Sequence, residues 1–435
     1  MNTMPRSGHY EQWHRKRHIG ESETMATSHR SNKAIGRPGA NTLMVALLVA
    51  LLASACAAKA STPRPSPVTT AAPTPAPTSR SDVPSSVASE GWIAVSANAW
   101  DVGDGENGDI YLLSEGAAPR RVIGSDRDGI AQACPTFSPD GQRLAYGEAR
   151  ASGTVTTHRG KWPVSDRAVV VVELSNASKP LMRVTLPSDP GAIACPKWSP
   201  NGRYVAFRAG AGLWVADTTS GKTTVFQVGA TPWGQQGFAW SRDGSRVAVA
   251  ELGQIRVVPI NGSTPAVIQV TGGVPGRYTG SMGWTADDDA IVYVSTDPEG
   301  DALAVNRVNA DGTNHTPLAS GGGAAVSPDG TRVAYITSTS GVFNGQPNDE
   351  HVLTMDTRGG DVVKVPVPPD FVLEGLLWSP DGKRLLLSSI DGVVSVAVAP
   401  GSPPIVYATG LYRSGLDLEW SFSEVTWQPK TGTTT

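Results

Sequence analysis

The side chains that most often carry chemistry are few and scattered in this sequence. Its three cysteines, Cys56, Cys134 and Cys195, are far apart, so no CxxC spacing supports a zinc site or thioredoxin-type chemistry. The chain contains no G-x-S-x-G and no H-E-x-x-H motif, the local signatures of α/β-hydrolases and zinc peptidases. Only three of the seven histidines follow Cys56, and they are far apart. We therefore predict no catalytic residue, no bound metal and no cofactor.

Two weaker patterns also favour structural roles. Residues 221–223 (GKT) resemble the end of a phosphate-binding loop, but Ala216 stands where its first glycine belongs, and the segment reads as a hairpin between two strands. Asp101, Asp104 and Asp109 offer carboxylates to calcium, but their spacing does not match the D-x-D-x-D-G loop. We interpret them as solvated loop residues.

The composition favours many short strands over helices and excludes nucleic acid as a partner. The 435 residues include 48 Gly and 34 Pro, which is typical of a chain with many turns. Seven Lys/Arg and three Asp/Glu lie up to Cys56, so 29 of the 36 basic and 36 of the 39 acidic residues follow it, with a net charge of −7. Binding to a phosphate backbone needs clustered Lys and Arg, and this part of the chain is acidic.

The first 55 residues have the pattern of an export signal. Residues 43–55 (LMVALLVALLASA) are uncharged and too short to cross a bilayer as a helix, and basic residues precede them. Residues 1–24 add charges that export does not need, so translation starts at Met25 or the leader is unusually long.

Residues 53–56 (ASAC) resemble the lipobox of bacterial lipoproteins, in which cleavage leaves a diacylated cysteine at the new N-terminus. Ala53 stands where leucine is usual. We predict a lipid on Cys56; the alternative is ordinary cleavage after the A-x-A site. Residues 56–90 would then be the lipidated cysteine and a tether rich in Pro, Ser, Thr and Ala, whose composition cannot build a core.

Beyond Gly91 the sequence repeats a motif in which a large apolar residue precedes Ser-Pro-Asp-Gly. The copies are Phe137–Gly141, Trp198–Gly202, Trp240–Gly244, Trp284–Asp288, Val326–Gly330, Trp378–Gly382 and a degenerate Trp427–Lys430. Their first residues lie 61, 42, 44, 42, 52 and 49 positions apart, and a period near 42 fits a four-stranded propeller blade. In each copy the apolar residue ends a strand, Pro presets the turn, and Asp-Gly supplies its left-handed conformation.

This repeat resembles that of TolB-type β-propellers over residues 91–430, with departures at 287–289 (DDD) and at Val326. The resemblance implies an adaptor that docks envelope proteins or peptides at the mouth of the channel. Residues 92–123 hold the second to fourth strands of a blade, and 423–427 is an inner strand with nothing after it. Their pairing would close the ring. We predict an all-β, seven-bladed β-propeller, with six blades as the alternative, and a disordered tail at 431–435.

The face opposite the Asp-Gly turns holds the candidate binding residues. We expect three long loops there, at 97–108, 150–167 and 338–350. Exposed Trp, Tyr and Arg are typical anchors of interfaces. Trp162 is the best single candidate because no strand pattern around it explains a tryptophan; the alternative is that such residues plug the channel or pack under their own loops. The candidates are Trp162, His158, Arg159, Trp233, Arg277, Tyr278 and Tyr412.

Cys134 and Cys195 are candidates for a disulfide. Each lies three residues before its motif aromatic, so they occupy equivalent places in adjacent blades. Equivalent positions in a ring point the same way round, which opposes a bridge. The proline after each cysteine suggests the start of a strand, where side chains need not alternate, and an exported compartment permits oxidation.

We predict a non-catalytic lipoprotein of the cell envelope, at the outer face of the cytoplasmic membrane or elsewhere in the envelope. Its partner would be an envelope protein or peptide bound at the channel-mouth face. The alternative is an enzyme or a small-ligand receptor, for sugar or peptide, with its site at the channel mouth, because propellers host both.

Overall fold

The computed structural model describes fourteen stretches of the chain, all within one compact unit, Pro77–Thr435. The predicted leader, the lipid site Cys56, the tether and the tail lie outside the described residues. Within the described ranges, no helix has the length and apolar composition that crossing a bilayer requires. The stretches are 91–97, 108–124, 130–157, 160–187, 195–229, 237–251, 253–270, 281–296, 303–338, 350–369, 371–389, 392–399, 401–409 and 420–429.

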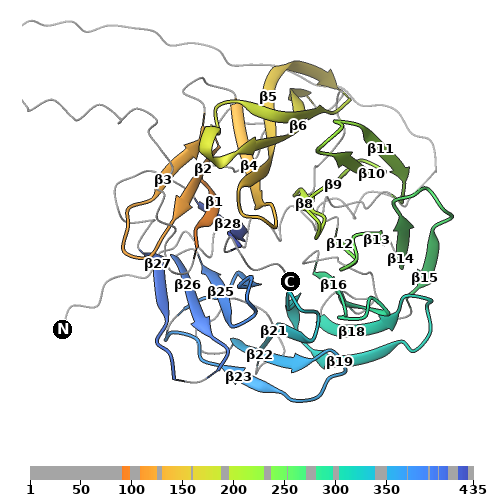
Figure 1. Ribbon diagram of the computed structural model, residues 1–435, viewed down its shortest axis with the longest axis vertical. Coiled ribbons are helices and arrows are strands. Elements are labelled where there is room, and N and C mark those ends of the chain that lie inside the picture. Colours follow the sequence, from red (N-terminus) through yellow and green to blue (C-terminus); the bar gives the residue numbers. More distant parts are fainter. Residues whose placement is uncertain are drawn as a thin grey trace, which may run out of the picture. The chain divides into compact units, whose positions relative to one another are not determined.

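Seven four-stranded sheets, with every pair of neighbouring strands antiparallel, form the seven blades of a β-propeller (Figure 1). The predicted count of seven is confirmed, and six is excluded. Blade 2 contains β4 (Ile130–Phe137), β5 (Arg143–Thr157), β6 (Gly160–Glu173) and β7 (Pro180–Thr185), with the 3-10 turn η1 (Leu174–Asn176) before β7. Blade 3 contains β8 (Lys197–Trp198), β9 (Tyr204–Ala209), β10 (Gly212–Asp217) and β11 (Thr223–Gln227). Blade 4 contains β12 (Phe238–Trp240), β13 (Arg246–Glu251), β14 (Gln254–Pro259) and β15 (Ala266–Gln269).

The remaining three complete blades follow the same order from the inner to the outer strand. Blade 5 contains β16 (Met282–Trp284), β17 (Ala290–Thr296), β18 (Leu303–Asn309) and β19 (Thr316–Ser320). Blade 6 contains β20 (Gly322–Val326), β21 (Arg332–Ser338), β22 (Glu350–Asp356) and β23 (Val363–Val365). Blade 7 contains β24 (Gly375–Trp378), β25 (Arg384–Ser389), β26 (Gly392–Ala397) and β27 (Ile405–Thr409).

Blade 1 joins the two ends of the propeller, as predicted. Its inner strand is β28 (Trp420–Trp427), which pairs with β1 (Ile93–Ala97), followed by β2 (Asp109–Leu113) and β3 (Arg120–Ile123). Gln428 locks this closure, because its backbone N–H donates to Trp92 O at 2.8 Å and its side-chain amide donates to Gly141 O at 2.7 Å. Gly141 has a φ of +68°, and a Cβ there would lie 2.6 Å from Pro429 O, so only glycine fits between the closing strand and blade 2.

The Ser and Asp of each motif are turn-forming residues. In blade 4, Ser241 Oγ donates to Asp243 at 2.6 Å and accepts the backbone N–H of Arg246 at 2.9 Å. The same two bonds recur at Ser138, Ser199, Thr285, Ser327 and Ser379. Partial burial by itself raises the pKa of Asp243, but hydrogen bonds from Ser241 and Ser245 lower it below the ordinary value. Hydrogen bonds lower the pKa of Asp140, Asp287 and Asp329 in the same way, so these four carboxylates stay ionised in their turns.

The sequence of blade 5 departs from the motif, but its turn has the same conformation and hydrogen bonds as the others. Asp288 takes the place of the usual glycine and adopts the left-handed φ of +55°, which a short polar side chain tolerates better than a bulky one. Its carboxylate accepts the N–H groups of Arg242 and Asp243 at 2.7 and 2.9 Å. The aspartate thus adds two hydrogen bonds between the turns of blades 4 and 5.

The motif tryptophans connect neighbouring blades. Trp198 Nε1 donates to Thr136 O at 3.1 Å, and Trp240 Nε1 donates to Lys197 O at 3.1 Å, in each case in the preceding blade. Trp284 and Trp378 make the same bond. Around them, seven clusters of buried apolar side chains fill the seven blade junctions. The core is therefore a ring of interfaces between sheets.

The segment 150–167, predicted as a long loop, is a β-hairpin. β5 has 15 residues and β6 has 14, and they pair without a long loop as far as Thr157 and Gly160. The predicted loop is wrong because residues 154–157 (TVTT) are β-branched and favour a strand, which pairs with residues 160–163. The second strands of blades 3 to 7 have only six or seven residues.

The structure joins Cys134 and Cys195 in a disulfide, with Cα atoms 5.0 Å apart. The geometry that opposed this bridge does not apply, because the two positions are not equivalent in backbone conformation. Cys134 has a φ of +57° and lies at a bulge of β4, between Ala133 and Thr136. Cys195 lies before the short β8. A bulge redirects a side chain out of the regular alternation.

Candidate functional site

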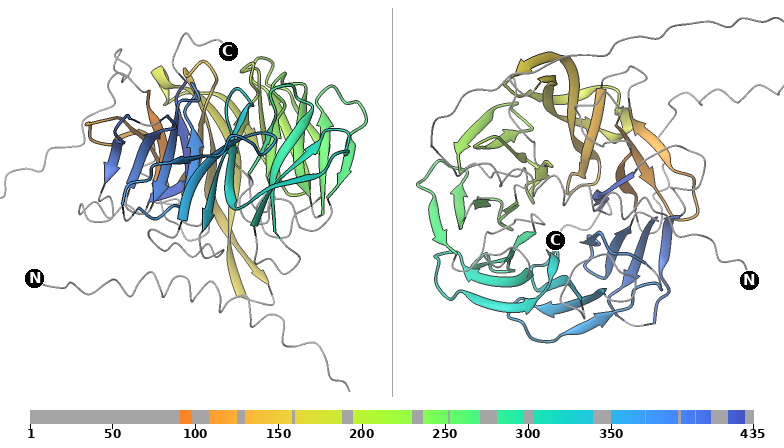
Figure 2. Two further views of the ribbon diagram at one scale, coloured as in Figure 1. Left: turned by 90° about the horizontal axis from the view of Figure 1, so that it is seen from below. Right: turned by 180° about the vertical axis from the view of Figure 1, so that it is seen from behind.

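The hairpin β5–β6 extends beyond the blades on the face opposite the Asp-Gly turns. β5 starts after the turn of blade 2 and runs away from it, so the hairpin extends on that opposite face (Figure 2). Its excess of about eight or nine residues over the other second strands corresponds to roughly 25–30 Å at about 3.3 Å per residue.

The outer part of this hairpin is a ribbon of two strands. β4 pairs with β5 only up to Arg150, and β7 pairs with β6 only from Ala168 on. Among the described strands, the ribbon, residues 151–166, therefore has ladder partners only within itself, and no described strand pairs with either of its edges. A two-stranded hairpin is marginally stable alone, and open edges invite pairing with another chain. The ribbon thus has the backbone arrangement of a docking element.

Trp162 lies in this ribbon, on β6, with its backbone opposite Val155. The other candidates, His158, Arg159, Trp233, Arg277, Tyr278 and Tyr412, lie outside the described residues. The predicted long loops at 97–108 and 338–350 also lie outside them, except for their end residues. The structure therefore assigns Trp162 to a strand. That the candidate residues lie together on one face stays a prediction.

At the base of the ribbon, Glu148 is a buried carboxylate held by two arginines. It is 7% exposed and accepts Arg150 Nε and Arg183 Nη2 on the same oxygen, both at 2.8 Å. Burial alone would raise the pKa of Glu148, but the hydrogen bonds and charges of Arg183 and Arg150 lower it below the ordinary value. Glu148 therefore stays ionised, and the three side chains together carry one net positive charge.

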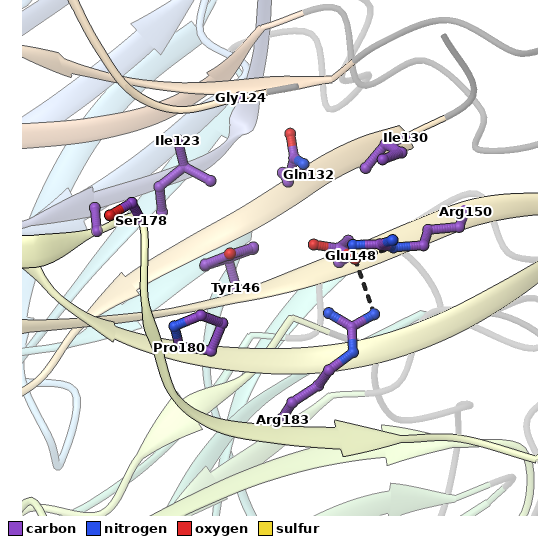
Figure 3. Close-up of a pocket in the computed structure, with 11 residues that line it drawn as sticks. Ile123, Gly124, Ile130, Gln132, Tyr146, Glu148, Arg150, Ser178, Pro180 and Arg183 are labelled. Carbon is purple, nitrogen blue, oxygen red and sulfur yellow. Dashed lines mark hydrogen bonds and ion pairs between the residues drawn. The ribbon is translucent and has the colours of Figure 1, made fainter. Parts of the chain in front are cut away.

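These residues line a pocket of about 430 Å³ between blades 1 and 2 (Figure 3). Gln132 comes from β4, Glu148 and Arg150 come from β5, and Arg183 reaches toward Glu148 from β7. Ile123, at the end of β3, contributes the wall from blade 1. The pocket lies between two blades, whereas the sequence placed a small-ligand site at the channel mouth.

A second buried carboxylate occupies the equivalent position in blade 4. Glu251 is 2% exposed, ends β13, pairs with Arg256 at 2.5 Å and accepts the N–H of Gly229 at 2.8 Å. Arg208, fully buried, donates to Gly229 O at 2.6 Å and to Ala250 O at 2.8 Å. Burial lowers the pKa of Arg208 to about 10, and the charge of Glu251 opposes this shift. This cluster fixes the point where the chain leaves blade 3.

Sequence reasoning missed both clusters, although a signal was present. Glu148 and Glu251 each lie five residues after the arginine that begins their strand, at the end of an apolar run. A carboxylate at that place in a buried strand needs a cationic partner. Arg150 and Arg256 lie within five residues of these glutamates and are visible in the sequence. Arg183 is 35 residues from Glu148, on another strand, so no local motif indicates that pairing.

The GKT segment and Asp109, considered above for phosphate and calcium binding, have structural roles. Residues 221–223 belong to the hairpin between β10 and β11, with Gly221 N–H donating to Asp217 O at 2.8 Å, as expected. Asp109 forms an ion pair with Arg121 at 2.7 Å, while Asp101 and Asp104 lie outside the described residues. Among the described residues, no three His, Cys, Asp or Glu side chains gather as metal ligands would.

Comparisons with known proteins find similarity only to solved structures. No protein-family model and no curated protein matches the sequence. Similar structures include TolB from Acinetobacter baumannii (14% identity, 78% of this chain and 82% of that chain, TM-score 0.41). An oligogalacturonate lyase in complex with manganese also matches (14% identity, 74% of this chain and 86% of that chain, TM-score 0.47). A prolyl endopeptidase matches as well (14% identity, 70% of this chain and 47% of that chain, TM-score 0.49). At such identities and TM-scores, these likenesses assign neither an activity nor a partner to the chain.

Proposed function

We propose that this protein is a non-catalytic adaptor of the cell envelope that binds a protein partner through the ribbon 151–166. The observation that carries the proposal is the ribbon itself: two strands whose edges pair with no other described strand, extending roughly 20–25 Å beyond the blade. Propeller folding does not require it, since blades 3 to 7 close with second strands of six or seven residues. A partner can add a strand to either edge.

The chemistry of the described carboxylates supports the absence of catalysis. Those with a lowered pKa are engaged in turns or ion pairs: Asp140, Glu148, Asp217, Asp243, Glu251, Asp287, Asp311, Asp329 and Asp356. A catalytic acid or base at neutral pH usually has a pKa moved toward 7, which is the opposite direction for a carboxylate.

The experiment is site-specific crosslinking in intact cells. A photoreactive residue replaces Trp162 in the ribbon, and a matched one replaces Lys222 in the β10–β11 turn on the opposite face. We expect discrete crosslinked proteins from position 162 and none from 222. Replacing residues 152–165 by a two-residue turn should abolish partner binding and leave the thermal unfolding of the propeller unchanged. Equal crosslinking from both positions, or binding that survives the deletion, would refute the proposal.

Trp162→Ala then tests the best single anchor. An aromatic hot spot typically contributes about 2 kcal/mol, so binding should weaken roughly thirtyfold while the fold stays stable. Unchanged binding would place the contact elsewhere in the ribbon.

The proposal places the adaptor at the membrane through a lipid on Cys56. It is supported by the uncharged stretch 43–55 and the cysteine directly after it. Several acyl chains on one residue give stable anchoring, at about 0.8 kcal/mol per buried CH₂. Mass spectrometry of the membrane fraction should find acylated Cys56 at the mature N-terminus; an unmodified Cys56, or a mature chain that starts elsewhere, would exclude the anchor.

A further inference from the structure

The pocket between blades 1 and 2 contains a buried acceptor without a donor. Gln132 is only 4% exposed, and its Oε1 has no hydrogen-bond partner within the described part of the chain. Its backbone is fixed, because its N–H donates to Gly108 O at 2.8 Å and it lies opposite Glu148 in the β4–β5 ladder. Buried polar groups are normally paired, and an unpaired one needs an explanation such as a ligand.

The same pocket presents donors that its own carboxylate does not use. Arg150 and Arg183 each spend one N–H on Glu148, and a guanidinium has five. The Arg150 and Arg183 side chains are 49% and 33% exposed, so their remaining N–H groups are accessible. Guanidinium groups match a carboxylate in geometry as well as charge. Because two arginines pair with one glutamate, one positive charge is left uncompensated in the pocket that Gln132 also lines.

The hydroxyl of Tyr146 is a third hydrogen-bond donor in the lining of the pocket. Burial of Tyr146 raises the pKa of its phenol, and the charge of Glu148 raises it further, so the hydroxyl keeps its proton. Tyr146 lies on β5 two residues before Glu148 and lines the same pocket. The lining therefore offers several donors and one buried acceptor.

We propose that this pocket binds an organic anion in which a carboxylate lies next to an N–H or O–H donor, the carboxylate on Arg183 and Arg150 and the donor on Gln132 Oε1. A hydroxy acid and the C-terminus of a peptide share this chemistry. The volume of about 430 Å³ suits a ligand of that size. The site is independent of the ribbon, because its lining lies in the blades themselves.

The test uses two matched pairs of probes on the purified propeller, read by isothermal titration calorimetry. D-gluconate is compared with uncharged sorbitol, and N-acetyl-dialanine is compared with its C-terminal amide. We expect saturable binding of at least one acid and none of its uncharged counterpart. Gluconate alone would indicate a hydroxy acid, and N-acetyl-dialanine alone a peptide C-terminus. If neither acid binds better than its counterpart, the proposal is overturned.

Two variants separate a binding role from a structural one. Arg183→Gln should weaken acid binding more than tenfold, and Arg203→Gln, which breaks the exposed ion pair with Asp217 in blade 3, should leave it unchanged. Gln132→Met keeps the shape and removes the orphan acceptor, so it should weaken binding about fivefold while the ligand-free protein unfolds at the same or a higher temperature. Undiminished binding in both pocket variants, or a Gln132→Met protein that is less stable with unchanged affinity, would refute the assignment.

Discussion

Trp427→Ala should open the ring at its closure. Trp427 is 4% exposed and packs with Ile93 and Val95 of β1 and with Leu386 of blade 7. Its ring meets Tyr407 edge-on, with centroids 6.0 Å apart. Truncating a buried tryptophan costs about 3–5 kcal/mol, and the lost aromatic pair adds roughly 0.5–1.5 kcal/mol. The expected loss of about 4–6 kcal/mol is a large part of an ordinary stability of about 5–15 kcal/mol.

The position of the strand makes this loss different from that of other core residues. Among the described strands, β28 pairs with β1 alone, and it belongs to a blade built from two distant segments of the chain. Without the Trp427 side chain, the strand keeps its pairing with β1 and the two hydrogen bonds of Gln428 but loses its apolar contacts with β1 and blade 7. We expect it to separate from β1 before the other blades unfold. A propeller that opens in part before it unfolds should show a smaller urea m-value, because m follows the surface exposed in the transition.

The matched control is Trp378→Ala. Trp378 is also 4% exposed and donates to Ala325 O at 2.9 Å, but its strand, β24, belongs to a blade formed by one continuous segment, β24–β27. Urea unfolding should show a lower midpoint at an unchanged m-value for Trp378→Ala, and a lower midpoint with a smaller m-value for Trp427→Ala. Both should lower the unfolding temperature by roughly 5–8 °C. Equal m-values in the two variants would show that β28 does not act as a separate closing element.

Two further predictions concern the disulfide and the turns. Unfolded, unreduced protein should expose no thiol from Cys134 or Cys195, and replacing both by Ser should lower stability by about 4 kcal/mol for a loop of 61 residues; two reactive thiols would exclude the bridge. The turn carboxylates, Asp243 among them, have a folded pKa below the unfolded value, so their contribution is complete above about pH 4 and declines as the pH falls through the folded pKa. Asp243→Asn, the residue type that blade 3 carries at Asn201, should therefore flatten the loss of stability between pH 5 and 3, and an unchanged slope would contradict this account.

The sequence predicts the blades because the information that builds them is local. The serine, aspartate and glycine of each motif form a complete turn within about six residues, so the pattern can be read without knowing any neighbour. The closure of the ring followed from counting strands in each segment. Even the disulfide could be anticipated from spacing, although its physical reason, the bulge at Cys134, appears only in the folded backbone.

The sites could not be predicted in the same way because they depend on contacts between distant residues. Gln132, Glu148 and Arg183 come from three strands, and the pocket needs Ile123 from another blade to be enclosed. No periodicity places these residues together. The ribbon was missed for a different reason: its β-branched residues indicated strands, but a blade of ordinary length left no sheet for them to join, and a hairpin that pairs only with itself is a rare solution.

The position of the ribbon follows from the mechanics of the ring. A projecting hairpin transmits any load on a partner to the blade that carries it, so that blade needs support from both neighbours. Blade 2 has it: Gln428 of the closing strand binds Gly141 in its turn, and the disulfide from Cys134 ties it to Cys195 before blade 3. Glu148 adds a third connection within the blade, because it accepts hydrogen bonds from Arg150 in β5 and Arg183 in β7 directly below the ribbon. Ring closure, the disulfide and the ion pairs of Glu148 therefore converge on blade 2, which has the longest of the described strands.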